Sequence, residues 1–305
     1  MSQLALTADR SLCQTVFTVQ DYDLAGTLTS GQAFRWQYRD GAWEGVIGSR
    51  WLRLCSNRDT ILAQTALPEP RWDWLADYLQ LHLDLSSVLA TFPDDAPMQM
   101  AVAACRGFRL LRQDPWECLA SFILSSSKQI VQIQQIVALL CKRFGEPVGV
   151  PPGRETVYAF PPPGRIASCT EGELRDCKMG FRAPYLRSTA RMIRDGEIDL
   201  CRLPTLPVND AQAELMKLPG VGRKIADCVL LFACGFQEAF PVDVWVMKAL
   251  RQLYFRRRRA NLKRLQRFTA THFGPNAGYA QQYLFHYMRT QREVSAENRK
   301  PTKNA

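Results

Sequence analysis

The chain lacks several features that would place it in particular protein classes. It contains no run of about 18 apolar residues, so we expect no membrane-spanning helix. Its start, MSQLALTADR, lacks the charged region and apolar core of a signal peptide, so we expect no secretion signal. Ten cysteines are scattered without a CxxC pair, and most stand in apolar stretches. We therefore expect reduced thiols inside the protein and no metal site.

Positive charge is abundant but unevenly distributed. The formal net charge is +10 over 305 residues. Residues 1–100 hold 7 Lys and Arg against 12 Asp and Glu, a charge of −5, so residues 101–305 carry +15. A basic C-terminal two thirds favours a polyanionic partner, nucleic acid ahead of an anionic membrane. A chain of this length can bury a sizeable core in two or three subdomains.

Hydrophobic periodicity changes along the chain. Residues 14–66 contain short strand-like runs separated by Gly, Asp-Gly and Ser turns, which predict a small antiparallel sheet. From Arg71 the apolar spacing is that of helices, and the Pro-rich stretch 147–164 predicts a loop. We predict an α+β protein with three parts: an antiparallel sheet subdomain at 1–97, a mostly α-helical domain at 98–294 and a polar, disordered tail at 295–305.

The most informative segment is the glycine turn LPGVG, which joins two predicted helices. Gly220 and Gly222 allow positive φ and a close approach to the backbone, so N–H groups around Val221 can point at a phosphate. The N-terminus of the following helix adds its positive end. The turn on its own also fits a hairpin that binds DNA phosphates and performs no chemistry.

Two charged side chains accompany this turn. Lys224 stands in the first turn of the second helix, where the protonated ammonium is disfavoured, so it is a candidate nucleophile. Asp243 ends a Pro-Val-Asp sequence nineteen residues later and is a good N-cap for a helix over 244–254. Taken singly, Lys224 fits a solvated surface residue and Asp243 fits a cap. Together with the turn they indicate chemistry on DNA.

The combination resembles the helix-hairpin-helix DNA glycosylases, in which a Gly/Pro-rich loop and a catalytic aspartate follow the hairpin. A lysine at the position of Lys224 marks the bifunctional glycosylase/AP lyases of that superfamily. Ser30-Gly31-Gln32-Ala33-Phe34-Arg35-Trp36 narrows the resemblance to the 8-oxoguanine DNA glycosylase/AP lyase group, and the match spans about 10–292. It implies that the Gly31 carbonyl accepts a hydrogen bond from N7–H of the oxidised base. Normal guanine presents N7 as an acceptor and is repelled there.

A second matching segment contains Gln281 and Phe285, four residues apart and so on one helix face. By resemblance, Gln281 contacts the Watson–Crick edge of the flipped base and Phe285 stacks on its ring. Cys228 lies four residues after Lys224 and is expected to pack against the other side of that ring. Phe285 and Cys228 taken alone are equally compatible with core packing.

A third group corresponds to family residues that fill the gap left by the flipped base and contact the orphaned cytosine. Ser127 stands where an asparagine is usual, Gln132 replaces an arginine and Phe181 replaces a tyrosine, whereas Arg182 is retained. Phe181 can still wedge into the base stack. These departures predict a weaker preference for cytosine opposite the lesion. Trp245 replaces a histidine and weakens one expected phosphate contact.

The resemblance implies a bifunctional glycosylase/AP lyase that excises 8-oxoguanine, or a related oxidised purine, from duplex DNA. We expect a monomer that needs no cofactor, located in the nucleoid of a prokaryote or the nucleus of a eukaryote. No cysteine after Cys234 is available for the iron–sulfur cluster of some superfamily members. The alternatives are a monofunctional alkylpurine glycosylase and a non-catalytic helix-hairpin-helix DNA-binding protein.

Overall fold

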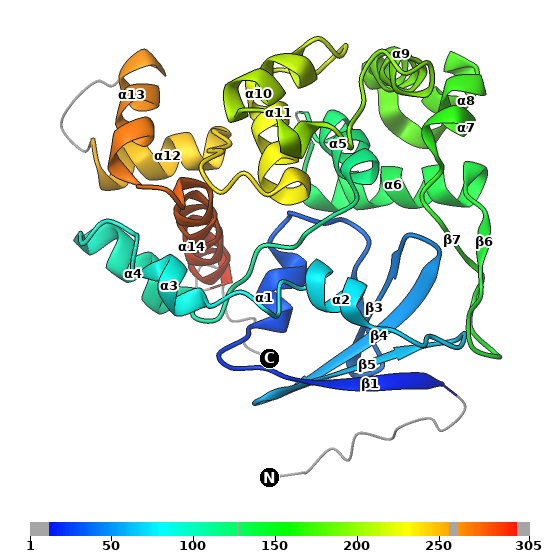
Figure 1. Cartoon of the computed structure of the whole chain (residues 1–305), viewed down its shortest axis with the longest axis horizontal. Helices are drawn as coiled ribbons and strands as arrows, with labels where there is room; N and C mark the ends of the chain where they lie inside the picture. Colours follow the sequence, from blue (N-terminus) through cyan, green and yellow to red (C-terminus); the bar gives the residue numbers. More distant parts are fainter. Residues whose placement is uncertain (1–11, 127, 256–261, 298–305) are drawn as a thin grey trace, which may run out of the picture.

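The computed structural model describes residues 12–126, 128–255 and 262–297. A five-stranded antiparallel sheet in the order β1-β5-β4-β3-β2 lies at one side of the helices (Figure 1). Its strands are β1 (Cys13–Thr18), β2 (Gln37–Arg39), β3 (Ala42–Ile47), β4 (Arg50–Asn57) and β5 (Thr60–Thr65). The structure therefore confirms the predicted α+β class, a sheet followed by a mostly helical region.

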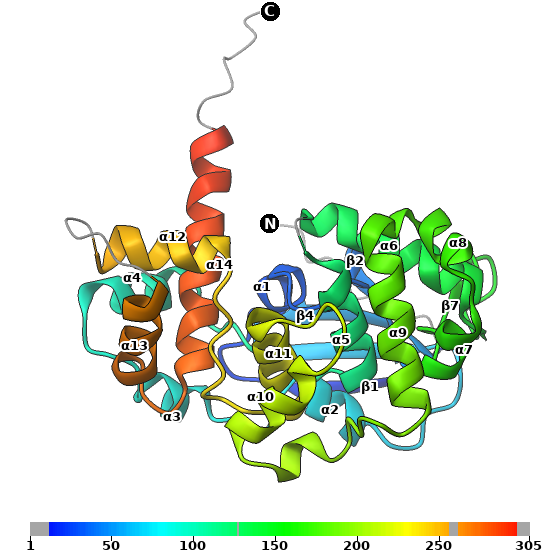
Figure 2. The same ribbon diagram turned by 90° about the horizontal axis from the view of Figure 1, so that it is seen from above.

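The helical part contains most of the chain. The helices are α1 (Leu24–Thr29), α2 (Asp73–Tyr78), α3 (Leu85–Leu89), α4 (Ala96–Ala104), α5 (Pro115–Leu124), α6 (Ile130–Phe144), α7 (Pro163–Ser168), α8 (Glu171–Leu174), α9 (Ala183–Arg194), α10 (Val208–Met216), α11 (Arg223–Val229), α12 (Val244–Leu253), α13 (Leu262–His272) and α14 (Ala277–Glu297), with short helical turns η1 (Arg175–Met179), η2 (Gly180–Arg182), η3 (Leu203–Thr205) and η4 (Leu230–Cys234). Figure 2 shows that the C-terminal end of α14 projects beyond its neighbours. No helix in the described ranges is long and apolar enough to cross a membrane.

Three details differ from the sequence-based expectation. Among the strand-like runs of 14–66, the run at 32–39 forms a strand only at its end, as β2, because residues 30–36 follow α1 as bends and irregular backbone. The Pro-rich stretch contains a two-stranded ladder, β6 (Pro147–Val148) with β7 (Val157–Tyr158), as well as the start of α7. Helix α14 continues to Glu297, past the start of the expected tail, and residues 298–305 lie outside the described ranges.

Two cores support these elements. Leu52, Leu54 and Ile61 on one face of the sheet pack under α1 and α2. The larger core surrounds α5, in which every residue from Cys118 to Leu124 is buried because the helix passes through the middle of the helical region. Helices α3 and α4 also contribute to this larger core, so the domain boundary at residue 97 stays a prediction.

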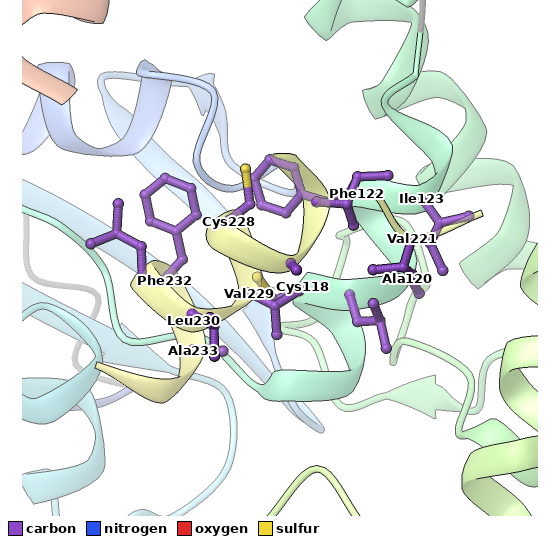
Figure 3. Packing of buried hydrophobic residues seen from close by; sticks show 14 of the residues in the cluster. Cys118, Ala120, Phe122, Ile123, Val221, Cys228, Val229, Leu230, Phe232 and Ala233 are labelled. Carbon is purple, nitrogen blue, oxygen red and sulfur yellow. The ribbon is translucent and has the colours of Figure 1, made fainter. Parts of the chain in front are cut away.

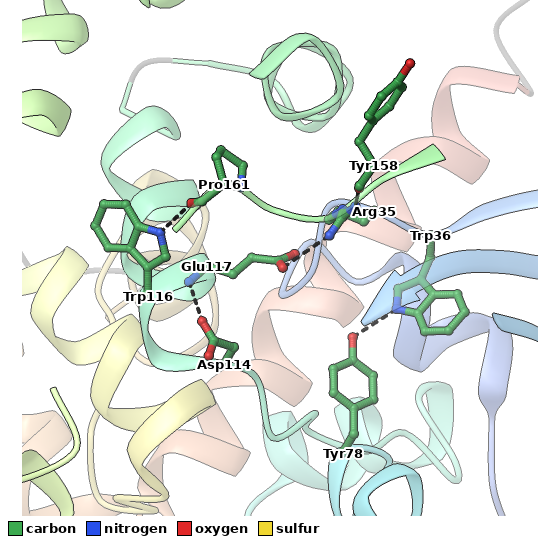
Figure 4. Close-up of polar contacts among 8 residues, drawn as sticks. All are labelled: Arg35, Trp36, Tyr78, Asp114, Trp116, Glu117, Tyr158 and Pro161. Atoms are coloured by element: carbon green, nitrogen blue, oxygen red, sulfur yellow. Dashed lines mark hydrogen bonds and ion pairs between the residues drawn. The ribbon is translucent and has the colours of Figure 1, made fainter. Parts of the chain in front are cut away.

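An ion pair joins the sheet to α5. Arg35, just before β2, donates from Nη1 to Glu117 Oε2 at 3.3 Å and also donates to the Tyr158 carbonyl (Figure 4). The next residue, Trp36, donates from Nε1 to the Tyr78 hydroxyl at 2.9 Å. The segment that carries Gly31 is thereby fixed to the helical region on one side and to α2 on the other.

Candidate active site

A cavity of about 710 Å³ opens between the turn after α1, the loop before α6, and helices α11 and α14. It brings together residues that are far apart in the sequence. Seven of the predicted site residues line it: Gly31, Lys224, Cys228, Asp243, Trp245, Gln281 and Phe285. The part of the site predicted for catalysis and base recognition therefore converges on one space.

Lys224 is the second residue of α11, two residues after the N-cap Gly222. Its Nζ lies 3.4 Å from Ser125 Oγ at the end of α5 and 4.9 Å from the centre of the Phe122 ring. The flanking residue Ile225 is buried in the core, so the helix cannot easily rotate the amine away from the cavity. Ser125 stands in the segment 124–130 that matches the family, but the sequence analysis assigned it no role.

Asp243 is the N-cap of α12, as predicted, and its Oδ1 accepts from Val246 N at 2.8 Å. Burial raises the pKa of this carboxyl, while the Val246 amide and the positive charge of Lys224 oppose the shift. One side chain therefore both starts a helix and lines the cavity beside the lysine.

Apolar groups form another wall of the cavity. The rings of Phe122 and Phe232 stack with centroids 5.5 Å apart, and Figure 3 shows the Cys228 thiol beside them. Burial raises the pKa of Cys228 to about 12, although Lys224 lowers it in part, so the thiol stays neutral. A flat, uncharged surface of this kind suits the face of a base. Phe232 was not among the predicted residues.

Gly31 and α14 stand at the cavity with Gln281 and Phe285. Gly31 has φ +90°, a conformation that strains any other residue, and a Cβ added there would also displace Ile130 Cδ1, which would lie 2.6 Å away. Gln281 is buried, and its Oε1 accepts from Gln282 Nε2 at 2.6 Å. The side chain is thus held in a defined orientation.

The hairpin turn lies next to an exposed aromatic residue. Gly220 has φ +79°, and a Cβ there would meet Tyr185 Cβ at 2.9 Å. Val221 is buried, and its amide donates to the Leu218 carbonyl at 3.1 Å. Its contribution to the turn is therefore packing and turn closure, whereas Gly222 has no atom within 4 Å of an added Cβ.

Phe181 projects from η2 with 57% of its surface exposed. Its ring contacts Tyr185 edge to face, with centroids 6.4 Å apart, and the Arg182 guanidinium lies 4.2 Å from its centre. Arg182 itself is 3% exposed and donates to the Met179 carbonyl at 3.4 Å. Burial lowers its pKa. Arg182, which was expected to contact the cytosine, is thus buried against the Phe181 ring and is not exposed beside it.

Three residues named in the sequence analysis remain: Ser127, Gln132 and Trp245. Ser127 falls outside the described residues. Gln132 Oε1 accepts from Gln129 N at 3.1 Å, so this side chain caps α6. Trp245 lines both the cavity and an adjoining groove of about 1030 Å³, and Lys248 Nζ lies 5.7 Å from its ring centre.

That groove is basic, and the sequence analysis had not identified it. Its cationic side chains are Lys128, Lys224, Lys248 and Arg251.

Seven of the ten cysteines are buried and all are unpaired, although Cys201 is exposed, contrary to the expected core position. Over the described ranges, no group of three or more His, Cys, Asp or Glu residues is arranged to hold a metal ion.

Two family models match adjoining parts of the chain. The N-terminal domain of 8-oxoguanine DNA glycosylase matches residues 15–119, and the HhH-GPD superfamily base excision DNA repair protein matches residues 120–272.

Individual relatives match over most of the chain. A probable N-glycosylase/DNA lyase of Methanothermobacter thermautotrophicus is 30% identical over 300 residues, covering 89% of this chain and 95% of the relative. An N-glycosylase/DNA lyase of Arabidopsis thaliana is 31% identical, covering 85% and 75%. The Clostridium acetobutylicum 8-oxoguanine glycosylase/lyase, solved with double-stranded DNA containing cytosine opposite 8-oxoguanine, superposes with a TM-score of 0.84 at 30% identity, covering 92% and 99%.

Proposed function

Because the chain belongs to the 8-oxoguanine DNA glycosylase family of the HhH-GPD superfamily, we propose that it excises 8-oxoguanine, or a closely related oxidised purine, from duplex DNA and then cleaves the strand. The observation that carries the proposal is that Lys224, Asp243 and Gly31 line one cavity. We place the protein where duplex DNA is stored, the nucleoid or the nucleus, and expect it to act as a monomer.

The target base must first leave the stack, which costs a few kcal/mol. Phosphates flanking it would bind at the turn that contains Gly220 and Gly222, next to the N-terminus of α11. The flipped base then lies between the Cys228 side of the cavity and Phe285, with Gln281 at its Watson–Crick edge. Gly31 accepts from N7–H, the donor that normal guanine lacks.

Chemistry starts at the anomeric carbon. The Lys224 amine forms a bond to C1′ as the bond from C1′ to the base breaks, and the base leaves with the electron pair and takes up the proton that the lysine nitrogen loses. Positive charge develops on the sugar, and the Asp243 carboxylate stabilises it. Ring opening gives a Schiff base between Lys224 and C1′. Loss of a C2′ proton then expels the 3′ phosphate, and water releases the lysine.

Two other functions fit less of the site. A monofunctional alkylpurine glycosylase activates water and has no use for the Lys224 amine in the cavity wall. A non-catalytic hairpin protein leaves Asp243 and Gln281 without a reason to line the same cavity as Lys224.

Borohydride trapping tests the proposal directly, because it reduces the Schiff base to a stable adduct. We expect the wild-type protein to be trapped on a duplex containing 8-oxoguanine, and Lys224→Gln to abolish the adduct while the protein still binds DNA. Lys217→Gln, which alters an exposed lysine paired with Glu214 before the hairpin turn, is the matched control and should be trapped normally. Strong trapping that persists in Lys224→Gln would assign the nucleophile elsewhere.

A further inference from the structure

Arg289 lies at the cavity although no sequence motif pointed to it. It follows Gln281 by eight residues and Phe285 by four on α14, so the three side chains share one helix face. Its Nη1 donates to the Thr29 carbonyl at 3.0 Å and lies 3.6 Å from the position of a Cβ added to Gly31. The guanidinium therefore contacts the turn that presents Gly31.

Other contacts fix the same turn from the opposite side. Gln32 is buried, and its Nε2 donates to the carbonyls of Thr27 and Arg109, both at 2.9 Å. Its Oε1 accepts from Leu111 N at 2.8 Å. The residue after Gly31 is thus immobilised by the protein interior, while Thr29, two residues before it, is held by Arg289.

We infer that Arg289 is a positioning residue for the discrimination of oxidised from normal guanine, acting through the Gly31 carbonyl. This inference rests on the proposed function. A hydrogen bond weakens steeply when its angle is lost, so a carbonyl that reads one proton must be held in direction as well as in place. Arg289 also links α14, which carries Gln281 and Phe285, to the turn after α1. All three groups that recognise the base are then held in one arrangement.

The test compares Arg289→Gln and Arg289→Lys with wild type on two lesions. One duplex contains 8-oxoguanine, and the other contains its 7-deaza analogue, in which carbon replaces N7 and the N7–H donor is gone. We expect Arg289→Gln to weaken binding of 8-oxoguanine DNA by about 3- to 10-fold, the usual range for one hydrogen bond. Binding of the 7-deaza duplex should change much less, and Arg289→Lys should recover part of the loss.

All binding is measured in a Lys224→Gln background, so that no base is released during the experiment. Arg106→Gln is the matched arginine control, because Arg106 pairs with Asp21 on the exposed surface. Equal losses on both lesions, or no loss on either, would overturn the role of Arg289. A thermal melt shows whether each variant folds. If Arg289→Gln does not fold, the ratio of the two affinities in Arg289→Lys, compared with wild type, decides the test.

The outcome for the proposed function is read separately from the wild-type protein. Failure of the wild type to excise 8-oxoguanine and to be trapped by borohydride would reject the proposed function. Normal excision and trapping, with an unchanged affinity ratio in both Arg289 variants, would reject only the inference about Arg289.

Discussion

At the scale of single residues, Asp243 has a structural role in the fold and a proposed chemical role in the reaction. The carboxylate caps α12 through Val246 N and lies at the cavity that Lys224 also lines. A carboxylate that only capped the helix could stand at the solvent surface, as Asp84 does before α3. The partly buried position of Asp243 beside Lys224 supports the proposed second role of the carboxylate.

Replacing Asp243 with asparagine separates these two roles. Asparagine caps helices about as well as aspartate, so Asp243→Asn should keep most of the stability. Base release should slow by about 10²-fold or more, because the charge that stabilises the sugar cation is gone. Single-turnover excision measures the effect, and Asp84→Asn is the matched control. Rates within a few fold of wild type in a folded Asp243→Asn protein would leave the carboxylate with a structural role only.

The residues that sequence reasoning could and could not identify differ in a physical way. Gly31, Lys224, Asp243 and Gln281 were predictable because their neighbours form a motif or because their chemistry is unusual in its context. Ser125, Phe232 and Arg289 reach the same cavity only through long-range packing. A serine after an apolar run or an arginine in a polar helix has many ordinary explanations, so no local pattern distinguishes these three.

At the scale of elements, helix α11 carries a buried acidic side chain, Asp227, one turn after Lys224. Asp227 is 5% exposed, accepts a hydrogen bond from Gln212 and lies 3.8 Å from the Arg223 guanidinium. Burial raises its pKa to about 6 from 3.8, although both neighbours oppose the shift. The folded protein therefore holds this proton more tightly than the unfolded chain does.

This shift predicts how stability depends on pH. Between about pH 4 and pH 6 the folded state binds more protons at Asp227, so the free energy of unfolding falls as pH rises, and the loss is complete above pH 6. Asp227→Asn removes the cost, so it should be more stable than wild type at pH 7.5 by about 3 kcal/mol. The advantage should shrink at pH 4.5. Urea denaturation at both pH values decides this, and a difference independent of pH would contradict it.

We propose that the η2 turn and the start of α6 together determine which base the protein accepts opposite the lesion. Phe181 replaces a polar wedge, Gln132 is engaged in capping α6, and Arg182 is packed behind the Phe181 ring. Each correct bidentate contact to a base contributes about 1–3 kcal/mol of discrimination. The loss of such contacts predicts that excision opposite cytosine exceeds excision opposite adenine by a smaller margin than in strictly selective relatives.

Single-turnover rates on four duplexes that differ only in the opposing base measure this margin. Arg182→Ala should shrink it further if the guanidinium turns toward the orphaned base when DNA binds. A uniform slowing opposite all four bases would mean instead that Arg182 only supports the Phe181 ring. Near-complete refusal of every partner except cytosine, retained in Arg182→Ala, would assign the recognition to other residues.

The elements themselves were predictable to different degrees. The helices of the hairpin and the strands β3 and β4 follow hydrophobic periodicity, which reports directly on the face that is buried. Helix α1 was missed because its six residues are too few to establish a period, and Asp23 is the main indication of its start. The ladder β6·β7 was missed because each strand has two residues and lies among prolines.

At the scale of the whole molecule, charge and architecture agree. The acidic 1–100 region contains the sheet, whereas the basic remainder contains the hairpin and the groove beside the cavity. The arrangement of these parts around one cavity was not predictable from periodicity, because it depends on α14 returning from the end of the chain to the turn after α1. The resemblance indicated which residues meet, and the structure supplies the contacts that bring them together.

The charge distribution leads to a prediction about binding to undamaged DNA. A protein that neutralises Z phosphates displaces counterions, so the logarithm of its affinity falls with the logarithm of salt concentration with a slope near −0.9Z. The +15 charge of residues 101–305 and the basic groove imply several such contacts, so we expect a steep, linear decrease.

Lys248→Gln should reduce the slope by about 1, because Lys248 lines the groove beside Trp245. Arg71→Gln, at an exposed position in the acidic region, should leave it unchanged. Fluorescence anisotropy between 50 and 200 mM salt, roughly the range over which such contacts are lost, measures all three slopes. A flat dependence would remove DNA as the partner, and an unchanged slope in Lys248→Gln would move the path of the backbone away from the groove.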